Sequence, residues 1–251
     1  MVNRPMRRTL AALVISLFLD TALADSLRVY TENFRPYQFQ SETGEIKGFG
    51  VELVEAMFSK ANIEIIDKIR LSVWDTAYQR TLNEPDAAIF MTVRNVTREN
   101  LFQWVGPLAP RSMWLYKLSK RKDIQAKTLE EAKDYTVGTY KSAQSDYLQE
   151  LGFPKLDIIL KEELNIKKLI AGRVDLIPST EAMMVSKLHE LGKDQSIVEK
   201  VVLLDDRFSY YLAINKQADP KLVTRLQKAL DELKQSGFYD AKHQEYMQGK
   251  F

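Results

Sequence analysis

The sequence predicts an α/β protein of two lobes, each a mainly parallel sheet flanked by helices. Short apolar strand patterns alternate with helical patterns along the chain, which is typical of a parallel α/β sheet. The same alternation begins again in the second half of the chain. Two longer strand patterns, at 112–118 and 208–214, follow the first and the second unit. We therefore expect the chain to cross between the lobes on these two segments.

The first 24 residues have the pattern of a secretory signal peptide. Three arginines precede an apolar run at 9–19, and a small-x-small site ends at Ala24. The apolar run is shorter than the roughly 20 residues that a membrane-spanning helix needs. We therefore expect cleavage after Ala24 and a mature protein in the periplasm. Removal of this segment leaves equal numbers of basic and acidic residues.

Charge and composition exclude several classes of function. The 251 residues carry a formal net charge of only +2, whereas nucleic-acid binders usually have a strong basic excess. The chain has no cysteine, which excludes disulfides, thiolate nucleophiles and cysteine zinc sites. Its two histidines, His189 and His243, resemble helix-surface residues, and we assign them no role. We expect no metal, no cofactor and no nucleic-acid partner.

Each predicted lobe is a run of short strands and helices. Residues 25–112 are expected to form the first part of lobe 1, residues 113–208 lobe 2, and residues 209–251 the return to lobe 1. The elements of lobe 1 are predicted as strands at 27–31, 63–69 and 87–91 and helices at 49–61 and 74–82. Those of lobe 2 are predicted as strands at 135–139, 156–160 and 174–178 and helices at 142–151 and 163–171.

The helix of the return segment has the clearest boundaries. Asp219 is a typical N-cap, Pro220 suits the first turn, and Gly237 marks the end. Leucines at helical spacing between them form an apolar stripe. We expect this helix to pack on lobe 1.

Several motifs, in order and spacing, resemble a known family. They include the entry to the first predicted helix at 44–53, the segment 92–107, the segment 135–142 and the segment 172–175. Together they resemble the periplasmic solute-binding proteins of ABC transporters, in the family 3, polar amino-acid type. The resemblance implies the two-lobed type II periplasmic-binding-protein fold and a clamp that closes on a small solute. It also implies an inner-membrane ABC permease as partner and a monomer.

The resemblance assigns roles to residues of lobe 1. Arg98 matches the family arginine that holds a ligand carboxylate, a role that suits a planar guanidinium; alternatively it is an exposed arginine in a helical turn. Arg94 is either a second anion contact or a loop charge, and Thr92 is a hydroxyl close to the ligand. Tyr37 and Trp74 are expected to wall the pocket, with core packing as the alternative for each.

In lobe 2 the resemblance points to two loops. Ser142 and Gln144 lie where a helix begins after a strand, so backbone N–H groups there could attract an anion. Thr180 stands where amino-acid binders often have an aspartate that pairs with the ligand ammonium. Glu181 could substitute for it, or could be an acid in the first turn of a helix.

We expect a periplasmic protein that captures a small polar, carboxylate-bearing solute for ABC-type uptake, without catalysis. Two alternatives remain open at this stage. One is a lyase on the same fold, similar to cyclohexadienyl dehydratases, with Glu181 as general acid. The other is a sensing module for a membrane receptor, since a fold does not determine function.

Overall fold

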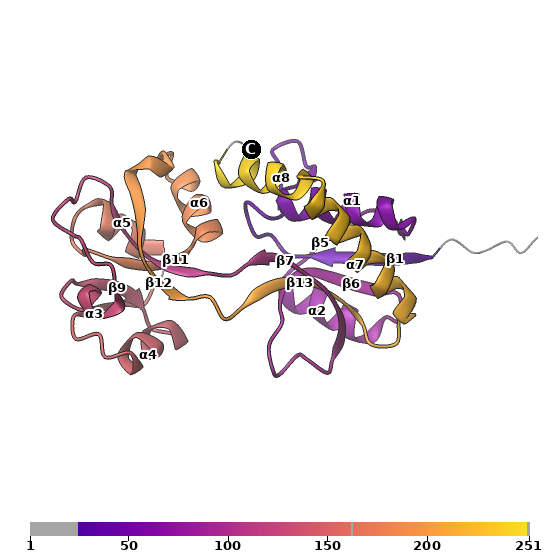
Figure 1. The fold of residues 1–251 in the computed structure, drawn as a ribbon, viewed down its shortest axis with the longest axis horizontal. Coiled ribbons are helices and arrows are strands. Elements are labelled where there is room, and N and C mark those ends of the chain that lie inside the picture. The colour runs from indigo at the N-terminus through magenta and orange to yellow at the C-terminus, as the bar shows by residue number, and fades with distance from the viewer. Residues whose placement is uncertain (1–24, 162, 250–251) are drawn as a thin grey trace, which may run out of the picture.

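The computed structural model describes residues 25–161 and 163–249, so the predicted signal peptide lies outside the described residues. The chain forms two lobes along the long axis of the molecule, joined by extended segments (Figure 1). No helix in the described ranges combines the length and the apolar character needed to cross a membrane.

Lobe 1 is built on a six-stranded sheet with strands in the order β4-β1-β6-β13-β7, and with β5 also paired to β1. β1 pairs in parallel with β4, β5 and β6, whereas β13 is antiparallel to both β6 and β7. The sheet is thus mainly parallel, as predicted, with β13 as its antiparallel strand, because β13 enters the sheet in the opposite direction on the return from lobe 2. The strands are β1 (Ser26–Thr31), β4 (Glu64–Ile65), β5 (Arg70–Leu71), β6 (Ala87–Val93), β7 (Phe102–Pro110) and β13 (Ser209–Asn215), with a separate hairpin of β2 (Phe39–Gln40) and β3 (Ile46–Lys47).

Helices cover both faces of this sheet. α1 (Phe49–Ala61), α7 (Pro220–Gln235) and α8 (Phe238–Met247) lie on one face, and α2 (Trp74–Asn83) lies on the other (Figure 1). Their apolar sides bury leucine, valine and phenylalanine side chains against the strands, and this burial is the main contribution to the stability of the lobe. Asp219 caps α7 by accepting the Lys221 N–H at 2.9 Å, as predicted.

Lobe 2 repeats the layered arrangement with a mixed set of strands. β11 and β12 pair antiparallel with β8, β9 and β10 pair in parallel, and a parallel bridge from Val137 to Leu176 joins the two sets. Helices pack on both sides of these strands. The elements are β8 (Met113–Leu118), α3 (Leu129–Ala132), β9 (Val137–Tyr140), α4 (Ala143–Glu150), β10 (Leu156–Ile159), α5 (Glu163–Ile170), β11 (Ile177–Thr180), α6 (Glu181–Glu190), a 3-10 turn (Gln195–Ile197) and β12 (Val198–Asp205).

The two crossings between the lobes are shorter than the strand patterns predict. β8 lies wholly in the lobe 2 sheet and β13 wholly in the lobe 1 sheet, so only the residues between β7 and β8 and between β12 and β13 link the lobes. The two links run side by side, and the Arg111 N–H donates to the Phe208 carbonyl at 3.1 Å. Strands β7 and β12, which lead into these links, were not predicted.

The lobes also meet away from the two links. Ala182, in the first turn of α6, is 1% exposed and packs in the same apolar cluster as the core of lobe 1. α6 lies beside α8 at this point (Figure 1). One edge of the interlobe space is therefore closed by packed helices.

Candidate functional site

A pocket of about 420 Å³ lies where the loops of lobe 1, the first link and the start of α6 come together. In lobe 1 these loops follow the carboxyl ends of β1, β5 and β6, the edge at which α/β sheets bind ligands. The pocket is lined by Glu32, Asn33, Phe34, Trp74, Met91, Val93, Arg98, Arg111, Met183 and Tyr210. Two of the nine predicted site residues, Arg98 and Trp74, are among them.

Arg98 is held in place from several sides. Its backbone N–H donates to Asn95 Oδ1 at 3.1 Å, and its Nη1 donates to the Val93 carbonyl at 3.2 Å. Its guanidinium carbon lies 5.2 Å from the ring centroid of Trp74 and 5.4 Å from that of Tyr78, close enough for cation–π attraction. In the described part of the chain, the bond from Nη1 to the Val93 carbonyl is the only hydrogen bond of the Arg98 side chain. The other N–H donors of this guanidinium can bind a planar anion.

Trp74 is the first residue of α2 and lies between two hollows of lobe 1. It lines the main pocket and a neighbouring one that also includes Glu32, Asn33 and Val73. Its ring lies 5.5 Å from the ring of Tyr78, one turn along the same helix, at an interplanar angle of 31°. The pair forms an aromatic base beneath Arg98, because residues four apart share a helix face.

Two charged residues of the pocket were not singled out by sequence reasoning. Glu32 directly follows β1, and its partial burial raises the pKa of its carboxyl group. Arg111 lies in the link after β7. Burial raises the pKa of Tyr210, and the nearby positive charge of Arg111 opposes that shift. Glu32 could have been found as the polar residue at a strand end, but Arg111 enters the pocket only because two distant segments pair at the links.

Three predicted residues of lobe 1 lie outside this pocket. Tyr37 is 3% exposed and packs against Phe34 and Tyr210 at centroid distances of 5.3 and 5.6 Å. Thr92 is fully buried and is not part of the pocket lining, although its neighbours on β6, Met91 and Val93, line the pocket.

Arg94 lies in a different hollow. Its Nε and Nη2 donate to the two carboxylate oxygens of Glu99 at 2.7 and 2.6 Å, and its guanidinium carbon lies over the rings of Trp104 and Tyr211. This hollow is lined by residues of the same loop and of the second link, Arg207 among them. The Glu99 carboxylate therefore occupies the paired N–H donors of Arg94 that an anionic ligand would otherwise bind.

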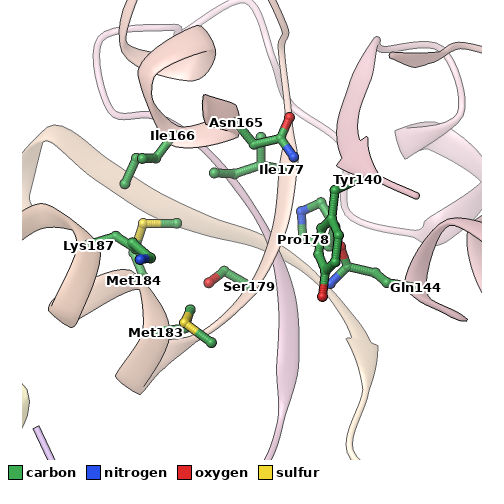
Figure 2. A pocket seen from close by; sticks show the side chains of 10 residues that line it. All are labelled: Tyr140, Gln144, Asn165, Ile166, Ile177, Pro178, Ser179, Met183, Met184 and Lys187. Carbon is green, nitrogen blue, oxygen red and sulfur yellow. The ribbon is translucent and has the colours of Figure 1, made fainter. Parts of the chain in front are cut away.

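The facing surface of lobe 2 has a much smaller hollow, of about 30 Å³ (Figure 2). Gln144 lines it; its Oε1 accepts the Thr139 hydroxyl at 3.0 Å and its Nε2 lies 3.6 Å from the sulfur of Met113. Ser142 is the N-cap of α4, and its hydroxyl accepts the Gln144 N–H at 3.2 Å. That backbone donor is therefore already satisfied within lobe 2.

Thr180 and Glu181 line neither hollow. The Thr180 hydroxyl caps α6 by accepting the Met183 N–H at 3.3 Å. Glu181 Oε2 lies 3.1 Å from Lys200 Nζ and is near His243 of α8. His243 is not a plain surface residue: it stacks on Tyr239, and burial lowers its pKa.

Comparison with known families agrees with this architecture. The family described as bacterial extracellular solute-binding proteins, family 3, matches residues 27–249. The chain belongs to this family. A relative from Neisseria gonorrhoeae, described as a probable histidine-binding protein, is 24% identical over 217 residues, which cover 85% of this chain and 79% of the relative.

Solved structures share the fold of this solute-binding protein. Substrate-binding domain 2 of GlnP from Lactococcus lactis, in an open conformation, has a TM-score of 0.75 and 19% identity, covering 90% of this chain and 97% of that one. An amino acid ABC transporter substrate-binding protein from Streptococcus pneumoniae, bound to L-arginine, has a TM-score of 0.61 and 15% identity, covering 88% and 93%. The predicted type II fold and family are confirmed.

Met183 connects the two hollows of the solute-binding protein. It lines both the pocket of lobe 1 and the smaller hollow of lobe 2, and it follows Ala182, which packs into lobe 1. In Figure 2 it lies on the first turn of its helix, beside Ser179 and across from Gln144 and Tyr140. The two hollows are therefore neighbouring parts of one interlobe space.

Proposed function

We propose that the protein captures an amino acid between its lobes and delivers it to an ABC importer in the inner membrane, after export and cleavage at Ala24. The observation that carries this proposal is Arg98, which lines the 420 Å³ pocket and has a guanidinium that packs on two aromatic rings and keeps N–H donors free for a ligand. Such a fork matches the two oxygens of a carboxylate. Glu32, on the same lining, offers the carboxylate that an ammonium group needs.

Capture requires no covalent chemistry in this proposal. A solute held by Arg98 would stabilise the closed arrangement because it gains contacts there with lobe 2, for instance with Gln144. The lyase alternative has less support, since Glu181, its general acid, is paired with Lys200 and lines neither hollow.

The proposal is tested by titrating the purified protein with the common L-amino acids in a calorimeter. We expect micromolar or tighter binding of at least one of them, and no binding of its methyl ester, which lacks the carboxylate. Arg98→Gln should weaken binding at least about 30-fold, as the loss of a bidentate charge-assisted contact implies. Equal affinity of the wild type and Arg98→Gln would contradict the carboxylate role.

A matched control and an uptake assay complete the test. Arg94→Gln removes the same charge four residues away, where Glu99 already occupies the guanidinium, so it should change the affinity by less than about threefold. Delivery is tested by uptake of the radiolabelled amino acid into cells with and without the gene. Undiminished uptake without the gene would contradict the transport role.

A further inference from the structure

The interlobe lining has more positive than negative charges. Among the residues that line the two neighbouring hollows, Arg98, Arg111 and Lys187 are cationic and Glu32 is anionic. Lys187 Nζ lies 3.4 Å from a carboxylate oxygen of Glu190, which lines neither hollow. The mature chain as a whole has balanced charge, so this excess is local to the site.

Of the three cationic residues, Arg111 has the least negative charge near it. Within residues 25–161 and 163–249 it has no ion pair, and the hydroxyl of Tyr210, which lies near its guanidinium, carries no charge to balance it. The nearby Asp205 carboxylate is attracted by Arg111 but is already engaged by Arg207, through Nε at 2.8 Å and Nη2 at 3.1 Å. Closure of the lobes would remove water from Arg111 without supplying it with a partner.

A neutral α-amino acid would leave this charge unanswered. Its carboxylate satisfies Arg98 and its ammonium group satisfies Glu32, which accounts for both of its charges. A desolvated guanidinium without a counter-charge is costly. A ligand that also carries an acidic side chain would supply the missing partner and would match the net charge of the pocket.

We propose that the solute is an amino acid with an acidic side chain and that Arg111 binds its second acidic group. This inference rests on the proposed function, in which Arg98 holds the α-carboxylate. Arg111 belongs to the link between the lobes and lines the pocket with Arg98, so it can reach a ligand whose α-carboxylate lies on Arg98. It thereby becomes the residue that determines specificity, whereas Arg98 serves any amino acid.

The test compares acids with their isosteric amides, L-glutamate with L-glutamine and L-aspartate with L-asparagine, by calorimetry. Each pair has the same α-carboxylate and ammonium group and almost the same size, so only the second charge differs. We expect the wild type to bind one acid at least about tenfold more tightly than its amide, as a charge-assisted hydrogen bond implies. In Arg111→Gln this ratio should fall below about threefold, and Arg111→Lys should restore part of it.

Arg94→Gln is the matched control, because it removes the same charge from a hollow outside the pocket, where Glu99 already occupies the guanidinium. It should keep the acid-to-amide ratio of the wild type, and thermal unfolding of each variant establishes that it is folded. Equal binding of acid and amide by the wild type would overturn the inference while leaving the proposed function intact. So would an Arg111→Gln variant that loses both ligands in equal proportion, or tighter binding of L-arginine or L-histidine than of either acid. If no amino acid binds, or if Arg98→Gln binds as well as the wild type, the proposed function itself fails.

Discussion

Tyr78 offers a test of how the pocket arginine is held. Its ring centroid lies 5.4 Å from the guanidinium carbon of Arg98, yet Tyr78 is not part of the pocket lining. Tyr78→Leu should therefore weaken solute binding by acting through Arg98. A cation–π contact is worth about 0.5–2 kcal/mol, which corresponds to a roughly 2- to 30-fold weaker affinity. The value should lie in the middle of this range, because the Trp74 ring at 5.2 Å remains as a second face.

Isothermal calorimetry with the tightest-binding amino acid measures this effect. Tyr78→Phe is the control, because it keeps the aromatic face and removes only the hydroxyl, and it should bind within about twofold of the wild type. Tyr78 also lies edge-on to Phe102 at 5.4 Å, so Tyr78→Leu will unfold at a lower temperature, and binding is measured well below that temperature. The reasoning is refuted if the Leu and Phe variants bind equally, since the aromatic face would then play no part.

Two further predictions concern stability. Asp219→Ala should lower the free energy of unfolding by about 1 kcal/mol, because it removes the N-cap that accepts the Lys221 N–H; urea denaturation measures this, and an unchanged midpoint would contradict the cap assignment. Burial lowers the pKa of His243 below its ordinary value of 6.5, with Glu181 and Asp240 opposing the shift and Lys200 adding to it, so the unfolded chain binds the proton more readily. The wild type should thus lose stability as the pH falls below 6.5. His243→Phe, which keeps an aromatic ring, should lose less stability between pH 7.5 and pH 5, as measured by urea denaturation at both pH values. Identical losses in the two proteins would contradict the lowered pKa of His243.

Local patterns predicted the elements whose boundaries are set by local chemistry. α1 spans Phe49–Ala61 as expected, because its apolar spacing and the turn after it are both local features. Of the strand expected at 63–69 only β4 at Glu64–Ile65 forms, and β5 begins at Arg70, since Asp67 and Lys68 adopt positive φ angles of 56° and 72° and turn the chain. β7 could not be predicted in this way, because Gly106 and Pro107 within it are unfavourable in a strand. The strand forms by pairing with β13, which comes from a distant part of the chain.

The site shows the same division between local and long-range information. The resemblance indicated Arg98 and Trp74, and both line the pocket. Thr92, expected to present its hydroxyl to the ligand, is fully buried and outside the pocket lining; the positive φ of 54° at Met91 interrupts the regular alternation of β6 just before it, which no local pattern reveals. No local pattern could reveal that Glu99 occupies the guanidinium of Arg94, because a sequence does not tell which of several neighbouring acids an arginine will meet.

The packing of α6 limits how the lobes can close. Ala182 is buried in the apolar cluster of lobe 1, and Thr180 fixes the start of the same helix by capping it. A movement that separated Ala182 from lobe 1 would expose apolar surface, so closure is favoured when the lobes rotate about this edge and about the two links rather than slide. In such a rotation Met183, which follows Ala182 and lines both hollows, would move less than the α4 side of lobe 2, which includes Gln144. The ligand would therefore meet a nearly fixed surface of Arg98, Arg111 and Met183 first, and the α4 side of lobe 2 afterwards.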